Sequence, residues 1–219
     1  MSAVASTPSP SSPLRLRGLY GITPEDRALP LLLQQVEAAL AGGMRVLQYR
    51  SKSSDARRRA GEAQALCRLC HAHGARLIIN DDVALAIQVG ADGAHLGRDD
   101  GDLSAARAAL GPQRLLGASC YNELALAQRA LAAGADHVAF GAAFASRTKP
   151  NASQATLTLY QSARASLQAP IIAIGGITPD NAAPLVAAGV DALALVSGLF
   201  DAADIQLAAS AISSLYSTT

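Results

Sequence analysis

The chain has 219 residues, of which 50% are hydrophobic and 16% charged, and its formal net charge is +1. This length suits one domain with a sizeable core. The small net charge gives no electrostatic reason for binding nucleic acid or an anionic membrane. No apolar run reaches the roughly 18 residues that a membrane-spanning helix needs.

The N-terminal segment, residues 1–17, is rich in Ser and Pro and lacks the basic and apolar regions of a secretory signal. We predict that it is a disordered tail and that residues 18–219 form one catalytic domain. The cysteines Cys67, Cys70 and Cys120 do not suggest a disulfide framework, and the first two share one face of a predicted helix. We therefore expect structural thiols in a reduced, cytoplasmic protein.

From Gly18 onward, short apolar runs alternate with longer amphipathic ones, and this alternation predicts parallel βαβ units with right-handed crossovers. The predicted strands are Gly18–Thr23, Arg45–Tyr49, Arg76–Ile79, Gly93–Leu96, Arg114–Ala118, His137–Phe140, Ile171–Ile174 and Ala192–Val196. The predicted helices are Leu29–Ala41, Asp55–His73, Val83–Val89, Leu103–Leu110, Asn122–Ala133, Ser153–Leu167, Pro179–Ala188 and Ala202–Leu215.

A weak internal repeat places a glycine at the end of four predicted helices, shortly before the next strand. The four are Gly43, Gly90, Gly134 and Gly189, and a glycine there fits a position of positive φ. With eight strand–helix pairs, this regularity favours an α/β fold of the closed (β/α)8 TIM barrel type. The alternative is an open doubly wound sheet, but the first strand carries no glycine fingerprint.

Two neighbouring predicted strands end in acids. Asn80, Asp81 and Asp82 follow the third strand, and Asp99 and Asp100 follow the fourth. Isolated carboxylates are costly to bury, so packing does not explain them. Adjacent strand ends lie about 4.8 Å apart, which lets Asp81 and Asp100 share one hard cation. The alternative is that these acids are solvated loop residues or helix N-caps.

Basic side chains gather at the same predicted rim. Gln48, Arg50 and Lys52 alternate along the chain, so their side chains point to one side and can converge on a ligand. Only two of the 18 basic residues are lysines, Lys52 and Lys149, and both fall at predicted strand ends. A compact ammonium group there can bind a single phosphate oxygen.

Glycines after the last two strands predict an anion site. In the segment Gly175–Pro179, Thr178 suits a helix N-cap and Pro179 the first helical position, so backbone N–H groups can approach an anion. The eighth strand ends in Val196-Ser197-Gly198, and barrels often bind phosphate between these two loops. The alternative for the paired glycines is an ordinary tight turn.

This inventory predicts Mg²⁺ as cofactor and phosphorylated small molecules as substrates, because Mg²⁺ commonly binds one or two carboxylates together with substrate phosphates. None of the four glutamates directly follows a predicted strand, which disfavours an enediol-type isomerase with a glutamate base. Departure of a diphosphate depends more on charge stabilisation than on a base. A dissociative substitution at an activated carbon therefore fits best.

Eight motifs in order resemble the thiamine phosphate synthase family over about residues 18–200: GLYGIT, QYRSK, LIINDD, GADGAHLGRDD, GAS, TKP, AIGGIT and VSGLF. The resemblance implies a (β/α)8 barrel that uses Mg²⁺ to join a hydroxymethylpyrimidine diphosphate to a thiazole phosphate. The implied products are thiamine phosphate and diphosphate. The implied mechanism is loss of diphosphate to a pyrimidine methyl cation, which the thiazole nitrogen captures.

The resemblance also implies residue roles: Asp81 and Asp100 as metal ligands, and Arg50, Ser119 and Lys149 in catalysis. The implied substrate-binding residues are Gln48, Tyr49, Arg50, Ser51, Lys52, Asn80, Ser119, Ser146, Arg147, Thr148, Lys149, Gly176, Val196 and Ser197. The chain departs from the family pattern in two places. Ser51 replaces a common acid, and Ser146-Arg147-Thr148 stands where two threonines usually flank a proline.

Three other functions remain open from the sequence. A thiazole tautomerase-like barrel would share the fold but need not bind a diphosphate. A Schiff-base aldolase would need a lysine in an apolar pocket, whereas Lys52 and Lys149 have polar neighbours. A ligand sensor without activity would keep the pocket. A homo-oligomer is compatible with the sequence.

Overall fold

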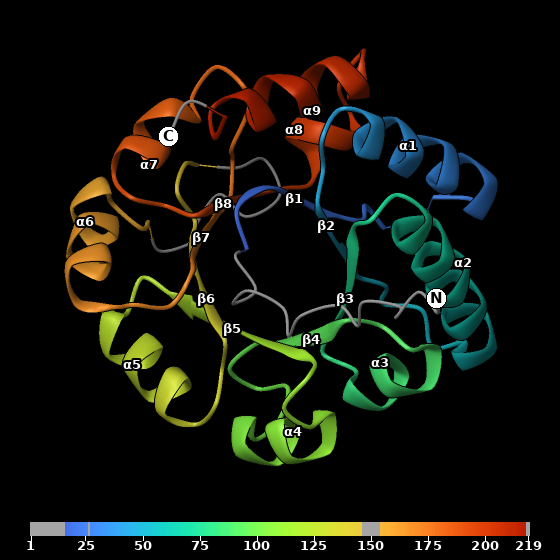
Figure 1. Cartoon of the computed structure of the whole chain (residues 1–219), viewed down its shortest axis with the longest axis horizontal. Coiled ribbons are helices and arrows are strands. Elements are labelled where there is room, and N and C mark those ends of the chain that lie inside the picture. Colours follow the sequence, from blue (N-terminus) through green and yellow to red (C-terminus); the bar gives the residue numbers. More distant parts are fainter. Residues whose placement is uncertain (1–15, 26, 146–153, 218–219) are drawn as a thin grey trace, which may run out of the picture.

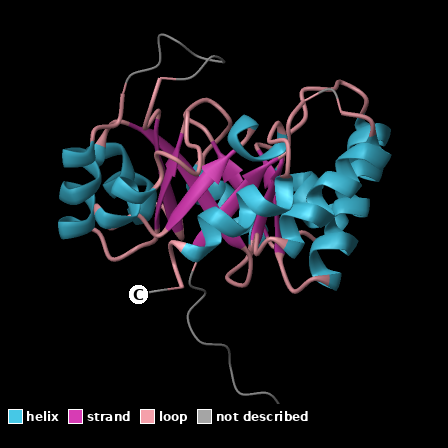
Figure 2. Cartoon of the chain, turned by 90° about the horizontal axis from the view of Figure 1, so that it is seen from above, coloured by secondary structure: helices cyan, strands magenta, loops and turns pink. Residues whose placement is uncertain are grey.

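Parallel pairing closes eight strands into a barrel, in the order β1 to β8, with β8 paired to β1. The computed structural model describes residues 16–25, 27–145 and 154–217. Helices surround the ring of strands (Figure 1), and the view at right angles shows them packed outside the strands (Figure 2). The predicted TIM barrel is confirmed, and the open doubly wound alternative is wrong. The predicted tail lies mostly outside the described residues.

The observed elements follow the predicted ones closely. The strands are Gly18–Ile22 (β1), Val46–Tyr49 (β2), Arg76–Asn80 (β3), Gly93–Leu96 (β4), Leu115–Tyr121 (β5), His137–Gly141 (β6), Ile171–Ile174 (β7) and Ala192–Leu195 (β8). The helices are Leu29–Ala41 (α1), Ala56–Ala72 (α2), Val83–Val89 (α3), Leu103–Leu110 (α4), Leu124–Ala132 (α5), Leu157–Ser166 (α6), Ala183–Ala187 (α7), Ser197–Phe200 (α8) and Ile205–Ser214 (α9). The short helix α8 was not predicted.

Alternation along each strand divides the core into two parts. One set of side chains packs between the strands and the helices, for example Leu47, Leu77 and Leu193. The other set fills the inside of the barrel. This inner set comprises Leu16, Tyr20, Ile22, Val46, Ile78, Leu115, Ala139, Ile172, Ala192 and Ala194. The barrel is therefore a packed core, and space for ligands is left at its ends.

The glycine repeat belongs to a larger motif at the start of the strands. Gly43, Gly90, Gly134 and Gly189 all have positive φ, as predicted. Two residues after three of these glycines stands an aspartate, just before the next strand. Its carboxylate accepts a hydrogen bond from a backbone N–H at the start of the preceding strand. These bonds are Leu77 to Asp92 (2.8 Å), Leu116 to Asp136 (2.7 Å) and Ile171 to Asp191 (2.7 Å). Each aspartate also pairs with His71, Arg107 or Arg164.

Polar side chains replace apolar ones in the middle of the barrel interior. Gln48 and the rings of His95 and His137 are buried, and the Gln48 amide donates to the Tyr20 hydroxyl at 3.0 Å. The two histidine rings lie 5.7 Å apart between centroids. Burial lowers the pKa of His95 to about 4 and that of His137 well below its usual value. Both rings are therefore neutral at physiological pH.

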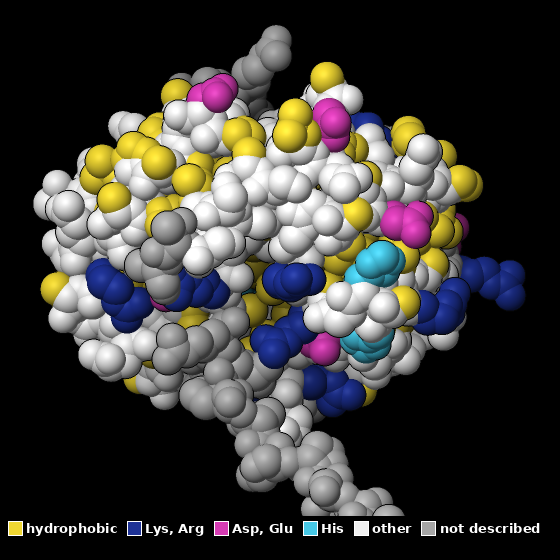
Figure 3. Space-filling model, turned by 45° about the horizontal axis from the view of Figure 1, so that its top comes forward, with side chains coloured by type: hydrophobic (Ala, Val, Ile, Leu, Met, Phe, Trp, Pro, Cys, Tyr) yellow, Lys and Arg dark blue, Asp and Glu magenta, His cyan; other side chains and the backbone are white. Residues whose placement is uncertain are grey.

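The cysteines are free and buried, as expected of structural thiols. Burial raises the pKa values of Cys70 and Cys120 to about 12, so both stay protonated. Among the helices in the described ranges, none has the length and apolarity to cross a membrane. On the face in Figure 3, most basic side chains lie in a band across the middle, and most acidic side chains lie above this band.

Gly117 on β5 is required by the packing of the two interior histidines. A Cβ atom at this position would lie 2.3 Å from His95 Nδ1 and 2.3 Å from His137 Nε2. We predict that Gly117→Ala lowers the free energy of unfolding by about 1–3 kcal/mol, as overpacking does. Thermal or urea unfolding measures the change.

A matched control is Gly61→Ala in helix α2, where a Cβ atom meets nothing within 4 Å. Because alanine favours a helix over glycine, this variant should gain up to about 1 kcal/mol. An unchanged midpoint for Gly117→Ala would show that the histidines can move aside.

Candidate active site

The carboxyl ends of the strands carry most of the predicted site residues that the structure describes. Thr23, just beyond β1, connects the end of β1 to the end of β2 through hydrogen bonds with the backbone of Arg50. Its hydroxyl accepts the backbone N–H of Arg50 at 2.9 Å and donates to the Arg50 carbonyl at 3.1 Å. The backbone at Arg50 is thereby held where β2 ends. Gln48, two residues earlier, points into the barrel beneath it, as the alternation predicted.

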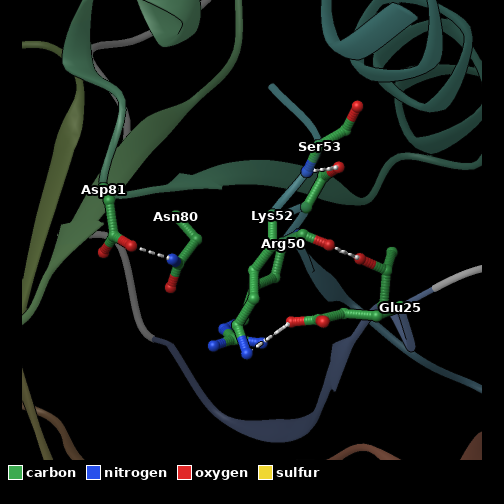
Figure 4. Close-up of polar contacts among 8 residues, drawn as sticks. Glu25, Arg50, Lys52, Ser53, Asn80 and Asp81 are labelled. Carbon is green, nitrogen blue, oxygen red and sulfur yellow. Dashed lines mark hydrogen bonds and ion pairs between the residues drawn. The ribbon is translucent and has the colours of Figure 1, made fainter. Parts of the chain in front are cut away.

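Arg50 and Lys52 converge on one carboxylate. The Arg50 guanidinium forms an ion pair with Glu25, and Lys52 Nζ lies 3.6 Å from the same oxygen, Glu25 Oε1. The Lys52 side chain is 70% exposed, whereas those of Arg50 and Glu25 are 36% and 31% exposed. Figure 4 shows Glu25 and Arg50 facing each other, with Asn80 and Asp81 on the other side of Arg50.

Asp81 and Asp100 come together where β3 and β4 end. Asp81 has a φ of 63°, its N–H donates to the His95 carbonyl at 2.9 Å, and its carboxylate accepts from the Asn80 amide. Asp100 accepts the backbone N–H of Gly97 at 2.9 Å. The pKa of Asp81 is raised to about 6 by desolvation and by a hydrogen bond and repulsion from Asp100, with Arg50 opposing the shift.

These two carboxylates fit a magnesium ion better than a metal held by the protein alone. In the part of the chain that the structure describes, no group of three or more His, Cys, Asp or Glu side chains is arranged to hold a metal ion. Mg²⁺ needs only one or two carboxylates when water and phosphate oxygens complete its coordination. A cation between Asp81 and Asp100 would also remove the repulsion that raises the pKa of Asp81.

Of the other two predicted acids, Asp82 has a structural role. Asp82 caps helix α3 by accepting the N–H of Leu85 at 2.8 Å, and it pairs with Arg59 at 3.0 Å. Asp82 is therefore the helix cap that the sequence left as its alternative role. Asp99 is exposed and has no hydrogen bond or ion pair among the contacts of the described residues.

Ser119 is fixed from inside the barrel. Strand β5 runs past the predicted end to Tyr121, with a register shift between Ser119 and Tyr121. The Ser119 hydroxyl lies 2.9 Å from His95 Nε2. Since His95 is neutral, this nitrogen either donates to the hydroxyl or accepts from it without placing a charge there. Ser119 thus sits above the interior histidines and beside the β4 end that carries Asp100.

The glycine-rich turn after β7 differs from the prediction. Helix α7 begins at Ala183, so Thr178 and Pro179 are neither its N-cap nor its first residue. The reason is Asn181, whose side chain accepts the Thr178 N–H at 2.8 Å and donates to the Gly176 carbonyl at 2.9 Å. These bonds close a separate turn before the helix can start.

A different helix end lies against that turn. The single-turn helix α8 starts at Ser197, directly after β8, with Val196 as its N-cap residue. A Cβ atom on Gly198 would lie 2.1 Å from the Ile177 carbonyl oxygen, so the two loops are in contact. The first N–H groups of a helix have no partner within it. The structure thus brings Gly176, Val196 and Ser197 together as predicted, but with α8 in place of α7.

Tyr49 does not face the barrel mouth, Ser51 lies in the groove beside Arg50 and Lys52, and four predicted residues lie outside the described residues. The Tyr49 hydroxyl donates to Glu62 at 2.7 Å, between β2 and α2, so this side chain does not face the barrel mouth. Ser51 accepts the N–H of Ser53 at 3.3 Å within its own loop. The predicted residues outside the described ranges are Ser146, Arg147, Thr148 and Lys149.

The sequence reasoning missed Glu25 and Thr23. Glu25 was set aside because it does not directly follow a strand, yet it reaches Arg50 and Lys52 from three residues beyond β1. A usable signal was present, because a loop that leaves a strand end stays on the same rim. An acid within that loop therefore meets the cations of the next loop.

The fold and these side chains define a class: a TIM barrel enzyme with two neighbouring carboxylates, basic side chains and a glycine-lined loop pair on its carboxyl-end rim. The family model described as thiamine monophosphate synthase matches residues 19–199.

Known proteins agree with this match. The chain is 56% identical over 200 residues to the thiamine-phosphate synthase of Chromobacterium violaceum, covering 91% of this chain and 96% of that one. It is 53% identical over 202 residues to the enzyme of that name from Aromatoleum aromaticum, covering 92% and 97%. The solved thiamine phosphate pyrophosphorylase of Pyrococcus furiosus superposes with a TM-score of 0.83 at 31% identity, covering 93% and 97%. The chain therefore belongs to the thiamine monophosphate synthase family, and its activity is that of a thiamine-phosphate synthase, which is a transferase.

Gly97 offers a test of Asp100 in which both aspartates are retained and only the position of one carboxylate changes. A Cβ atom at position 97 would lie 2.4 Å from Asp100 Oδ2, so Gly97→Ala must displace that oxygen. We predict that the Mg²⁺ concentration giving half-maximal activity rises roughly tenfold, as for other residues that orient metal ligands. Activity titrated with Mg²⁺ measures this, and the unfolding temperature serves as control. An unchanged response to Mg²⁺ would show that Asp100 is not a metal ligand.

Proposed function

We propose that this enzyme transfers the hydroxymethylpyrimidine group from its diphosphate to the nitrogen of a thiazole phosphate, with Mg²⁺ bound to Asp81 and Asp100. The synthase activity follows from the family; the metal, the substrates and the residue roles are the proposal. The observation that carries it is the geometry of Asp81 and Asp100, whose carboxyl groups lie within hydrogen-bond reach of each other beside Arg50, each held by its own backbone contact. Two carboxylates held together next to a cation suit a metal ion that shares its ligands with a diphosphate.

The bound Mg²⁺ would neutralise charge that develops on the departing diphosphate. Arg50 and Lys52 would contact other oxygens of that group, since guanidinium and ammonium both donate to phosphate. Asn80 carries an amide at the end of β3 and Gln48 carries one in the barrel interior beneath Arg50, and both groups could hydrogen-bond a pyrimidine ring. Asn80 also holds the carboxylate of Asp81 in place.

Ser119 would orient the leaving group or the ring from the end of β5, beside Asp100, with its hydroxyl fixed by His95. Lys149, outside the described residues, is the second lysine proposed for the diphosphate. The packed barrel interior keeps bulk water from entering from below. That would protect a carbocation-like intermediate until the thiazole nitrogen reaches it.

The thiazole phosphate would bind where the β7 and β8 loops meet. Gly176 and the start of α8 at Val196 and Ser197 provide backbone N–H groups, which suit a phosphate. Ser146, Arg147 and Thr148 are proposed for the same substrate from the loop after β6. We further propose a cytoplasmic location, supported by the free, buried thiols.

The thiazole tautomerase alternative is the weaker proposal. The matched relatives are named thiamine-phosphate synthases, and the cations Arg50 and Lys52 beyond the end of β2 have no evident use in a reaction without a diphosphate. The aldolase alternative is weaker too, because Lys52 is largely exposed and paired with Glu25.

The direct test is turnover of purified protein with both phosphorylated substrates and Mg²⁺. We expect thiamine phosphate and diphosphate in equal amounts, and loss of both products when a chelator removes the metal. Thiamine phosphate is measured by oxidation to its fluorescent thiochrome derivative. No product at any Mg²⁺ concentration would overturn the proposed substrates.

Asp81 provides the sharpest variant. Its left-handed backbone is tolerated by asparagine but strained for alanine. We predict that Asp81→Ala and Asp81→Asn both lower kcat/KM by about a hundredfold or more, because either change removes a metal ligand. Excess Mg²⁺ should restore activity only in part.

Comparing Asp81→Ala with Asp81→Asn separates the loss of charge from backbone strain. Only the alanine variant should also lose stability, by about 1 kcal/mol. An unchanged rate in Asp81→Asn would remove this residue from the site.

A further inference from the structure

We propose that Glu25 is a built-in counter-anion: its carboxylate holds Arg50 and Lys52 while no ligand is bound and must be displaced by the incoming diphosphate. This inference rests on the proposed diphosphate site. It assigns to Glu25 the role of a specificity-determining residue, which neither touches the reacting carbon nor binds the metal.

The geometry places three charges of this loop pair in one contact. A single oxygen, Glu25 Oε1, meets both the Arg50 guanidinium and Lys52 Nζ. The backbones that carry these groups are fixed to each other through the Thr23 hydroxyl, which bonds both the N–H and the carbonyl of Arg50. Since these anchors do not depend on Glu25, removing its charge should leave the cations at the rim.

The side chain of Glu25 has room to leave. A groove of about 470 Å³ opens beside the ion pair and is lined by Glu25, Arg50 and Lys52, with Arg27, Ser53 and Ser54 among its other residues. The side chains of Glu25 and Arg50 are each about one-third exposed, so water can solvate both charges when the ion pair breaks. An exposed pair of this kind is weak enough for a ligand to replace it.

Competition from a tethered carboxylate discriminates between anions. Glu25 is always present at a high effective concentration, so a free singly charged anion gains little by replacing it. A diphosphate carries more charge and can contact Arg50, Lys52 and a metal ion at once, so it outcompetes the carboxylate. The same competition would help to expel the diphosphate product, because Glu25 returns to the cations as the product leaves.

The test compares diphosphate binding by the full-length enzyme and three variants in the presence of Mg²⁺. In Glu25→Gln the competing charge is lost, and we expect inorganic diphosphate to bind about three- to tenfold tighter. Diphosphate should become a stronger product inhibitor by the same factor. Glu25→Asp keeps the charge and should lie near the wild type. Isothermal titration calorimetry and inhibition kinetics measure both effects.

Glu123→Gln is the matched control. Glu123 pairs with Arg98 on the same rim and is 47% exposed, so this substitution removes the same charge from a pair outside the proposed site. Its diphosphate affinity should stay within about twofold of the wild type, since exposed charges farther away are screened. An equal gain in diphosphate affinity in Glu25→Gln and Glu123→Gln would indicate a general effect of net charge and overturn the proposal.

A further variant separates this inference from the proposed function. Arg50→Gln should weaken diphosphate binding. If it does and Glu25→Gln binds like the wild type or more weakly, the counter-anion role is wrong while the diphosphate site stands. If Arg50→Gln leaves the affinity unchanged, or no protein binds diphosphate, the diphosphate site fails and the role of Glu25 fails with it. Unfolding temperatures establish that each variant is folded.

Discussion

The enforced proximity of Asp81 and Asp100 is the constraint on which the proposed site depends. Two carboxylates do not approach each other without a cost. Desolvation, and after it the hydrogen bond and repulsion from Asp100, raise the pKa of Asp81 to about 6. Backbone contacts hold the two residues in place. The Asp81 N–H donates to the His95 carbonyl from a left-handed conformation, and the Asp100 carboxylate accepts the Gly97 N–H. Neither contact is a feature of regular strands. Both place negative charge where a metal ion and a diphosphate would use it.

The same constraint explains why the barrel interior is polar in its middle. His95 contributes its carbonyl to Asp81 and its ring to Ser119, and so links the two carboxylates to the neighbouring strand β5. A ring of this size fits only because β5 carries glycine at position 117. Apolar residues close the barrel around this layer. The interior is therefore both a core and the support of the site.

Much of this arrangement could be predicted because it follows from local rules. Strand alternation placed Gln48 and Arg50 on one side, and the glycine spacing marked the helix ends. The error at Thr178 and Pro179 shows the limit of such rules. Their residue types suit a helix start, but the Asn181 side chain closes a turn there instead. Propensity cannot reveal which of two local hydrogen-bond patterns prevails. Likewise, Glu25 could not be assigned from its own neighbours, because its partners lie 25 and 27 residues away.

The unequal use of arginine and lysine has a physical reason in the structure. Arg107 donates to the carbonyls of Gly111, Arg114 and Gly134 and pairs with Asp136, so one planar fork joins several loops at the start of the strands. An ammonium group cannot span such a set of acceptors. Lys52 lies at the opposite end of the strands, largely exposed and held by one carboxylate oxygen. Arginine suits contacts that must persist, whereas a lysine that can exchange one oxygen for another suits a site where a charged ligand arrives and leaves.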